Sequence, residues 1–410
     1  MTFKNPTDQF HFHISKKGPE SARRGQLQTP HGTIETPAFI FCATKAAMKS
    51  LTIQQLRNCD TQIILSNTYH LMLQPGAEAV QHFGGLQKFT GWQGPMLTDS
   101  GGFQIFSLGH GTIADEIKGR RNEGRPKTLL KITEEGAFFR SYINGTQYCL
   151  TPEESIRVQR LLGADLIVVL DECTPYHVDK SYTEASMQRS HRWAVRSLNA
   201  YLAEDQGTQK LYGIVQGGIY PDLRKESVDF VNDHPFFGHA VGGSLGANKQ
   251  EMYDIVGLTL SLLSKERPVH LLGIGGIQDI FQGVLLGIDT FDCVHPTRIA
   301  RHGGALIKPW NRPDDLKREH INLRNSRYRL DESPIESDCF CTTCRTYTRG
   351  YLHHLLRTEE SLAFTLVSEH NAYFMNDLMK RIRDALETNR YRELYQLYLQ
   401  DLAPIEQPVS

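Results

Sequence analysis

Short apolar or β-branched segments recur along the chain, and most are followed by a segment with helical periodicity. Because these segments are apolar at nearly every position rather than at alternate ones, they predict strands buried on both faces, as in a parallel sheet with helical crossovers. Eight such strands are expected, at residues 36–41, 62–66, 95–98, 165–170, 211–215, 238–242, 269–274 and 287–292.

Eight strand–helix units favour an α/β fold of the (β/α)8 barrel type over an open, doubly wound sheet. The clearest helix lies in "TPEESIRVQRLLGAD", where Thr151 is suited to the N-cap, Pro152 to the first turn and Gly163 to the C-terminus. Glu154 would complete a capping box with Thr151. This pattern predicts a helix over residues 152–162.

Two stretches interrupt the alternation of strands and helices. Residues 109–136 are polar and punctuated by glycine, and predict a long insertion or hairpin after the third unit. Residues 305–350 are irregular, whereas residues 351–387 are strongly helical. We therefore expect a catalytic barrel over residues 1–304, an appended helical subdomain over 305–400 and a tail over 401–410.

Composition limits the class of protein without identifying it. The 410 residues are 40% hydrophobic and 22% charged, and no apolar run approaches the roughly 20 residues of a membrane helix. The N-terminus lacks the apolar stretch of a secretory signal, so we expect a cytoplasmic protein. A net charge of −1 excludes a globally basic nucleic-acid binder, but residues 291–329 carry nine Lys and Arg against four Asp and Glu.

Three of the eight cysteines form a cluster. Cys339, Cys341 and Cys344 fall within six residues, and in a chain without a signal this spacing favours a metal site over disulfides. A tetrahedral site needs a fourth ligand, and spacing alone leaves His353, His354 and His370 open as candidates.

Polar residues follow several of the expected strands. Asp99, Asp171 and Asp292 stand at the ends of the third, fourth and eighth strands, with Gln216 after the fifth and Gly243 after the sixth. Because active sites of barrels lie at the carboxyl ends of their strands, we expect these groups to converge. Converging carboxylates indicate either hard-cation binding or acid/base and nucleophilic chemistry at an acetal-like carbon.

Glycines beside these acids favour a flat organic ligand. The segments "SGGFQ" (100–104) and "VGGSLG" (241–246) allow the backbone to approach a planar heterocycle and offer N–H and C=O groups to its edge. Phe103 could stack on the face of such a ligand.

Several independent segments resemble one family, the tRNA-guanine transglycosylases, over almost the whole chain. They are "NTYHLMLQPGAE", "LTDSGGFQIFSL", "DECTPY", "FDCVHPTR" and "CFCTTC" followed by "SEHN". Members of this family exchange guanine at the wobble position of certain tRNAs for a 7-deazaguanine. The resemblance implies a (β/α)8 barrel with an appended zinc-binding helical subdomain, and it identifies His370 as the fourth ligand of one structural zinc ion per subunit.

The same resemblance assigns roles to the residues at the strand ends. Asp292 matches the nucleophile that attacks the ribose C1′, giving a covalent enzyme–RNA intermediate, and Asp99 matches the general acid/base. Cys293 would point away from Asp292 and serve packing. The base-binding positions are Asp99, Ser100, Gly101, Gly102, Phe103, Asp171, Gln216, Gly243 and Gly246. The RNA-binding positions are Gly273, Ile274, Gly275, Gly276, Ile277, Gln278, Asp279, Thr297, Arg298, Ile299, Ala300 and Arg301.

The implied partners are the anticodon loop of tRNAs with a GUN anticodon (those for Asp, Asn, His and Tyr) in a UGU context, together with guanine and the incoming base. Pro296 can open a helix, and a spacing of three would put Arg298 and Arg301 on one face toward this RNA. The resemblance also implies a homodimer, with no membrane association and no further cofactor.

The chain departs from the bacterial pattern in its base pocket. Bacterial members that insert preQ1 read "GGLAVGE" where this chain reads "GGSLGANK", so that Gly246 replaces a valine and Asn248 a glutamate. We therefore expect queuine, with its bulky cyclopentenediol, to be the incoming base, with preQ1 as the alternative. His295 stands where the family has an apolar residue.

An archaeosine-type enzyme and a non-catalytic tRNA-binding partner subunit are further alternatives. The first is disfavoured because no RNA-binding domain follows residue 400, and the second because both acids are present.

Overall fold

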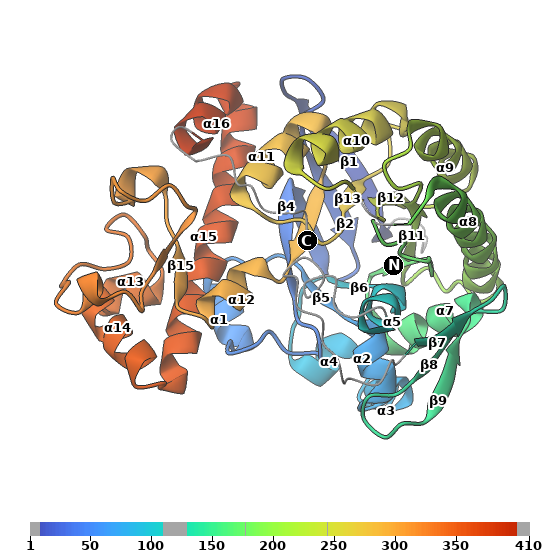
Figure 1. The fold of residues 1–410 in the computed structure, drawn as a ribbon, viewed down its shortest axis with the longest axis horizontal. Coiled ribbons are helices and arrows are strands. Elements are labelled where there is room, and N and C mark those ends of the chain that lie inside the picture. Colours follow the sequence, from blue (N-terminus) through green and yellow to red (C-terminus); the bar gives the residue numbers. More distant parts are fainter. Residues whose placement is uncertain (1–8, 110–128, 177, 244, 400–410) are drawn as a thin grey trace, which may run out of the picture.

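The computed structural model describes residues 9–109, 129–176, 178–243 and 245–399. Eight parallel strands close into a barrel (Figure 1), which confirms the expected (β/α)8 architecture. Each strand overlaps one of the segments predicted from the sequence. In their order around the barrel they are β10 (Leu166–Val168), β11 (Lys210–Val215), β12 (Gly238–Val241), β13 (Val269–Leu271), β14 (Thr290–Cys293), β4 (Ala38–Cys42), β5 (Ile64–Ser66) and β6 (Met96–Thr98).

The barrel strands are buried on both faces, as their continuous apolar sequences require. Every residue of β5, β6, β10, β12 and β13 is buried. Strand β14 pairs in parallel with β13 on one side and β4 on the other, which closes the barrel and places Asp292 opposite Ile40. The core is therefore a filled interior, and the carboxyl ends of the strands are where a site can form.

Helices surround the barrel on the side away from its core. The predicted helix over 152–162 is confirmed as α7 (Pro152–Leu162): the Thr151 hydroxyl accepts from the Glu154 N–H at 3.1 Å, and Gly163 ends the helix with φ +76°. The Glu154 carboxylate binds Arg157, at 2.8 Å. The other helices of this part are α1 (Ile53–Asn58), α2 (Thr68–Leu73), α3 (Ala77–His82), α4 (Leu86–Thr90), α5 (Gly102–Gly109), α8 (Lys180–Ala203), α9 (Pro221–Asp233), α10 (Lys249–Leu262), α11 (Ile277–Leu286) and α12 (His295–Ala300).

An antiparallel sheet of β1 (His11–Lys17), β2 (Arg23–Thr29) and β3 (Gly32–Thr36) precedes the barrel and was not predicted from the sequence. Two ion pairs attach this sheet to the amino-terminal ends of barrel strands. Arg23 binds Asp289, just before β14, and His31 binds Asp165, just before β10. The sheet therefore covers the amino-terminal end of the barrel and leaves the carboxyl end of the strands open for a site.

A second antiparallel sheet follows the third barrel unit. It consists of β7 (Leu129–Ile132), β8 (Ala137–Arg140) and β9 (Gln147–Leu150), and the Trp193 indole on α8 donates to the carbonyl of Glu134 beside it. The insertion predicted over 109–136 lies mostly outside the described residues. Of the part that is described, Gly109 ends α5 and residues 129–136 belong to this three-stranded sheet and its first turn.

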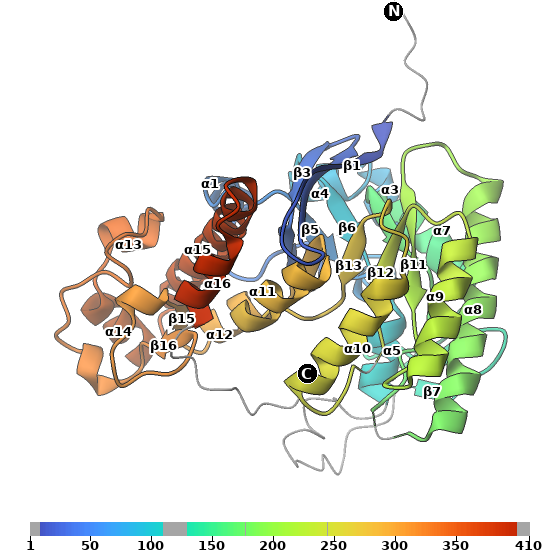
Figure 2. The same cartoon turned by 90° about the horizontal axis from the view of Figure 1, so that it is seen from above.

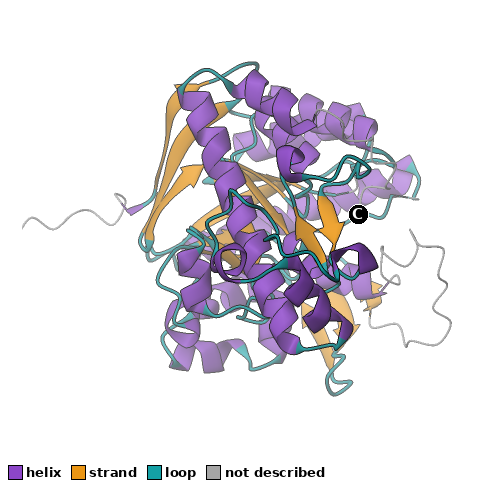
Figure 3. Ribbon diagram, turned by 90° about the vertical axis from the view of Figure 1, so that its left-hand side faces the viewer, coloured by secondary structure: helices purple, strands orange, loops and turns teal. Residues whose placement is uncertain are grey.

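After the barrel, the chain forms a lobe beside it, orange to red in Figures 1 and 2. The helical stretch predicted over 351–387 is two helices, α14 (Arg349–Arg357) and α15 (Ser361–Glu387). The second of them runs along the barrel side (Figures 1 and 2), and Figure 3 views the molecule from the side of the lobe. The first turns of α15 pack with Leu352 and Leu356 in a separate core, while the turns from Ala372 onward belong to the barrel core. The elements are β15 (Gly304–Leu306), β16 (His320–Asn322), two 3-10 turns (Pro309–Asn311 and Ser326–Tyr328), α13 (Thr342–Thr346), α14 (Arg349–Arg357), α15 (Ser361–Glu387) and α16 (Tyr391–Leu399).

Candidate active site and metal centre

The polar residues expected at the strand ends gather at the carboxyl end of the barrel. Asp99 follows β6 directly, Gln216 follows β11 directly, Asp171 lies three residues beyond β10, and Asp292 is within β14. Asp171, Gln216 and Asp292 are buried. The charge of Asp292 acts on Asp99 and that of Asp99 on Asp171, so the three carboxyl groups form one electrostatic unit.

Asp99 is held from the end of the neighbouring strand β5. One carboxylate oxygen accepts from the Thr68 N–H at 2.8 Å, and the other accepts from the Asn67 amide. Burial raises the pKa of Asp99 from 3.8 to about 6, against the opposing effect of these hydrogen bonds. A carboxyl group with a pKa near 6 can both give and take a proton close to neutral pH, as a general acid/base must.

Asp171 and Gln216 form a donor–acceptor pair at the barrel mouth. The Gln216 amide nitrogen donates to Asp171 at 2.5 Å, and burial raises the pKa of Asp171 to about 6. Among the described residues, the buried Gln216 amide oxygen has no hydrogen-bond partner. A side chain at Gly243 would place its Cβ 2.3 Å from that oxygen, so glycine is needed beside it. An orphan acceptor beside a buried carboxylate suits a ligand that carries several donors.

Glycines bring the segment after β6 against Asp171. A Cβ on Gly102 would lie 2.7 Å from the Asp171 carbonyl oxygen, and Gly101 has a φ of +86° that favours glycine. Ser100 reaches the Asp171 carboxylate at 3.4 Å. Phe103, the second residue of α5, is 51% exposed, so its ring is available for stacking.

Asp292 is contacted from three neighbouring segments. One carboxylate oxygen, Oδ1, accepts from the Gly273 N–H at 2.8 Å and lies 3.2 Å from the His270 Nε2. The other, Oδ2, lies 3.6 Å from the Cys42 thiol on β4. Cys293 packs against the barrel core, and burial raises the pKa of its thiol to about 12, so it is not a ready nucleophile.

The segment after β12 connects the site to α10. Gly246 is buried with φ +123°, and a Cβ there would lie 2.6 Å from the Glu251 carboxylate, so the backbone itself requires glycine. The Asn248 side chain caps α10 by accepting from the Glu251 N–H at 3.0 Å. Asn248 is thus engaged in holding the helix.

The two stretches expected to bind RNA flank Asp292. In residues 273–279, Gly273 is exposed, and Asp279 is bound by Lys249 at 2.8 Å and by the Tyr253 hydroxyl at 2.7 Å. Arg298 in α12 is exposed, whereas Arg301, the residue after this helix, is half-buried and donates to the Thr297 carbonyl. The remaining members of the two stretches are buried (Ile274, Gly275, Ile277, Thr297 and Ala300) or half-buried (Gly276, Gln278 and Ile299).

His295 opens α12 in a half-buried position, and burial lowers the pKa of its imidazole to about 4. Its ring is therefore neutral near pH 7 and substitutes for an apolar residue without adding charge.

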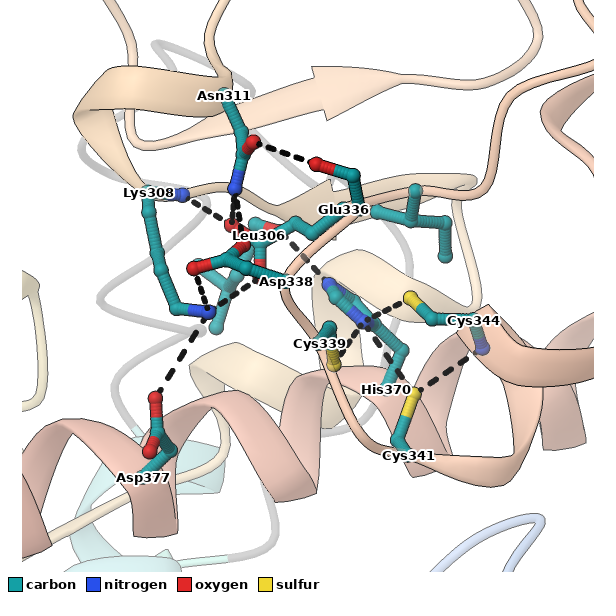
Figure 4. Close-up of polar contacts among 12 residues, drawn as sticks. Leu306, Lys308, Asn311, Glu336, Asp338, Cys339, Cys341, Cys344, His370 and Asp377 are labelled. Atoms are coloured by element: carbon teal, nitrogen blue, oxygen red, sulfur yellow. Dashed lines mark hydrogen bonds and ion pairs between the residues drawn. The ribbon is translucent and has the colours of Figure 1, made fainter.

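The cysteine cluster and His370 come together in a buried group (Figure 4), and the four donor atoms lie within 4.8 Å of one another. The His370 Nδ1 lies 3.7 Å from the sulfurs of Cys339 and Cys341 and 3.3 Å from that of Cys344. Tetrahedral zinc with ordinary Zn–S and Zn–N bonds would separate N and S by about 3.6 Å. The predicted fourth ligand is confirmed, and the set fits a structural zinc ion.

Hydrogen bonds outside the ligand set fix its geometry. The His370 Nε2 binds the Leu306 carbonyl at 2.8 Å, which directs Nδ1 toward the sulfurs. His353 is engaged elsewhere, with the Leu323 carbonyl. Next to the cluster, buried Lys308 pairs with Glu336 and Asp338. It also pairs with Asp377 on α15 at 3.8 Å, which links the segment before Cys339 to the helix along the barrel side (Figure 4).

Four residues of the site were missed from the sequence: Cys42, Asn67, Thr68 and His270. The first three stand at the end of β4 or just after β5, so the rule applied to the later strands would have found them. His270 lies within β13. Its proximity to Asp292 depends on the pairing of β13 with β14, which periodicity does not specify.

Comparison with known proteins agrees with this geometry. The family model described as queuine tRNA-ribosyltransferase matches residues 18–404. The queuine tRNA-ribosyltransferase of Roseiflexus sp. (strain RS-1) is 45% identical over 394 residues, covering 93% of this chain and 97% of that protein. Those of Protochlamydia amoebophila (45%; 92% of this chain, 94% of the relative) and Chlamydia pneumoniae (46%; 92% and 98%) are similarly close. The chain therefore belongs to the queuine tRNA-ribosyltransferase family, the tRNA-guanine transglycosylases, which are pentosyltransferases.

Proposed function

We propose that this enzyme exchanges guanine-34 in the anticodon of GUN tRNAs for a 7-deazaguanine base through a covalent Asp292–ribose intermediate. The observation that carries the proposal is the convergence of Asp99, Asp171, Gln216 and Asp292 on one end of the barrel, with Asp292 held by the loop after β13. A site with two carboxyl groups of raised pKa and a third beside them suits base exchange at an acetal-like carbon.

The reaction is a double displacement. A lone pair of the Asp292 carboxylate forms a bond to the ribose C1′ while the bond from C1′ to guanine N9 breaks, and guanine leaves with a proton from Asp99. The incoming base then gives its N9 proton to Asp99 and attacks C1′, and the electron pair of the C1′–O bond returns to Asp292. Two inversions restore the original configuration. Zinc takes no part, because the Cys3His set is closed and lies in the appended lobe.

The departing and arriving bases are held by their edges. The Asp171 carboxylate would accept from N1–H and the 2-amino group, and Gln216 and the backbone near Gly243 would bind the remaining edge. Phe103 would stack on the ring. The target base can be splayed from the anticodon loop at modest unstacking cost, with Arg298 and Arg301 bound to the RNA backbone. Since its substrate is tRNA, we place the enzyme in the cytoplasm.

Exchange of radiolabelled guanine into an unmodified GUN tRNA tests this function. Wild-type protein should incorporate label, and Asp292→Asn should not, because an amide cannot act as the nucleophile. Label incorporation by the variant at the wild-type rate would contradict the assignment of Asp292.

We propose queuine as the physiological incoming base. The support is the Asn248 side chain, which is engaged in capping α10 and leaves no carboxylate at that position for an aminomethyl group. Competition between free queuine and preQ1 in the exchange assay decides between them. An efficiency for preQ1 equal to or above that for queuine would overturn this proposal.

We further propose a homodimer that uses the zinc-bearing lobe. Apolar side chains are exposed there: Leu330 is 87% and Phe340 64% exposed, and the rings of Tyr347 and Tyr351 stack at 5.4 Å. Exposed apolar side chains of this size are typical of a contact surface. Sedimentation of wild type and Phe340→Asp should give a dimer and a weakened dimer, respectively, and a monomeric wild type at micromolar concentration would contradict the proposal.

A further inference from the structure

His270 lies on β13, directly beside the strand that carries Asp292. Its register partner is Thr290, and Thr290 and Asp292 are two residues apart on β14, so their side chains share one face. The imidazole lies between these two side chains. Its Nδ1 is 2.9 Å from the Thr290 hydroxyl, and its Nε2 is 3.2 Å from Oδ1 of Asp292. The His270 side chain is 3% exposed, so this position is built into the barrel rather than left to solvent.

The two contacts define which ring nitrogen carries hydrogen. A bare lone pair on Nε2 facing a carboxylate would be repelled, so Nε2 carries a proton and directs it to Oδ1. In the neutral ring, Nδ1 then accepts from the Thr290 hydroxyl, which can donate. The Nε2 atom lies close to Oδ1, but the geometry of this contact is not that of a hydrogen bond. Among the described residues, Nε2 has no hydrogen-bond partner. Contacts of this kind in an unliganded site commonly align when the substrate binds.

The two oxygens of Asp292 consequently differ. Oδ1 accepts from the Gly273 N–H and faces the His270 Nε2, whereas the described polar neighbour of Oδ2 is the Cys42 thiol, a weak donor at 3.6 Å. Oδ2 is therefore the freer oxygen for attack. We infer that His270 is a positioning residue. With the Gly273 N–H, it fixes Oδ1 of Asp292 and stabilises the negative charge that returns to this oxygen each time the ribose ester is broken. This inference rests on the proposed role of Asp292 as the nucleophile.

The charge on Oδ1 changes through the two half-reactions. When Oδ2 bonds to C1′ and the bond from C1′ to guanine N9 breaks, the carboxylate becomes an ester and Oδ1 its carbonyl oxygen. When the incoming base bonds to C1′ and the C1′–Oδ2 bond breaks, the electron pair returns and Oδ1 is again partly negative. Hydrogen bonds to a carboxylate are stronger than those to an ester carbonyl. His270 therefore favours the free carboxylate, and so release of the RNA, over the covalent intermediate.

The fraction of covalently bound tRNA is a readout that a packing role of His270 would not change. In His270→Leu, the fraction of tRNA bound covalently at a fixed guanine concentration should rise. The substitution removes more stabilisation from the free Asp292 carboxylate than from the ester. The loss of the attraction between the Nε2 N–H and the free carboxylate corresponds to an increase of about tenfold in the ratio of adduct to free enzyme. The kcat for exchange should fall by up to about tenfold, whereas kcat/KM for tRNA, which reports formation of the ester, should change by less than about twofold.

Matched variants separate positioning from packing. His270→Gln places an amide N–H near the Nε2 position and should restore both the adduct ratio and most of kcat. Thr290→Val leaves the ring in place but removes its anchor, and should shift the adduct ratio in the same direction by a smaller factor. His239→Leu, on the next strand β12, is the control: that histidine is fully buried, and neither of its ring nitrogens has a partner among the described residues. It should leave the adduct ratio unchanged.

The adduct is measured on denaturing gels with labelled tRNA, next to wild type and Asp292→Asn. An adduct ratio in both His270→Leu and Thr290→Val that equals or falls below the wild-type value would overturn the inference, as would an equal rise in His239→Leu. If wild type forms no adduct, or Asp292→Asn forms one, the proposed nucleophile fails instead, and the two failures are therefore distinguishable.

Discussion

Replacing Asp171 by Asn should stabilise the protein while removing most of its affinity for guanine. Burial raises the pKa of Asp171 from 3.8 to about 6, so at pH 7.5 the folded state holds a carboxylate that its surroundings disfavour. The shift corresponds to about 3 kcal/mol of lost stability. The amide of Asp171→Asn would not carry that charge, and its oxygen could still accept from the Gln216 amide that now binds Asp171 at 2.5 Å. Keeping a buried, charged Asp171 carboxylate to bind guanine therefore lowers the free energy of unfolding.

The expected size of the effect follows from the length of the chain. For 410 residues that unfold together, 3 kcal/mol corresponds to a rise in Tm of about 3 °C. Because the pKa of Asp171 is raised on folding, its destabilisation is full above about pH 6 and vanishes as the pH falls toward 4. The gain of Asp171→Asn in calorimetry should therefore shrink between pH 7.5 and pH 4.5.

Guanine binding should move in the opposite direction. The amide oxygen can accept a hydrogen bond from one guanine donor, but the amide NH2 would face the other donor and repel it. This should cost about 3 kcal/mol of binding free energy and raise KM for guanine by about 10²-fold. The assay is guanine exchange at pH 7.5 beside the melting curves. A lower Tm for Asp171→Asn at pH 7.5, or an unchanged KM, would refute this account of the pocket.

Three further predictions concern the parts that support the site. Arg23→Met leaves Asp289 buried without its partner and should cost about 3–5 kcal/mol, seen in calorimetry as a Tm lower by about 3–6 °C; a loss under 1 °C would contradict the role of this pair. The hydrogen bond to Asp165 raises the pKa of His31, so its contribution is present below about pH 6.5 and lost as the pH rises through the raised pKa. His31→Gln should accordingly cost about 0.5–1 kcal/mol at pH 6 and less at pH 8.5, and equal losses at both would count against the pairing. Chelation of zinc should open the appended lobe to proteolysis and weaken the dimer, and metal-free protein with unchanged melting and activity would show that the Cys3His set has no structural role.

The barrel was accessible from sequence because its strands are buried on both faces. A run such as "DLIVVL" is informative without knowledge of its partners, and the eight runs place each strand within a few residues. The sheet β1 to β3 was missed because β1 alternates exposed and half-buried residues, as "HFHISKK" does, and this pattern resembles a polar leader. Its two anchors, Arg23 and His31, contact aspartates more than 130 residues away.

The site was predictable where it depends on chain position and not where it depends on strand pairing. Asp99 and Gln216 directly follow barrel strands, so the strand-end rule finds them. His270 lies inside β13, and only the register of β13 against β14 brings it to Asp292. Gly246 illustrates a third case, because its positive φ gives the residue a backbone role that the comparison of sequences had attributed to the pocket.

The central claim is that Asp292 carries the ribose during base exchange, and peptide mass spectrometry tests it most directly. Enzyme incubated with GUN tRNA in the absence of free base is denatured, digested with ribonuclease and protease, and searched for a peptide bearing a nucleotide. We predict one modified peptide, the one that contains Asp292, and none in Asp292→Asn. A nucleotide attached to any other residue, or a modified peptide from the Asp292→Asn protein, would contradict it.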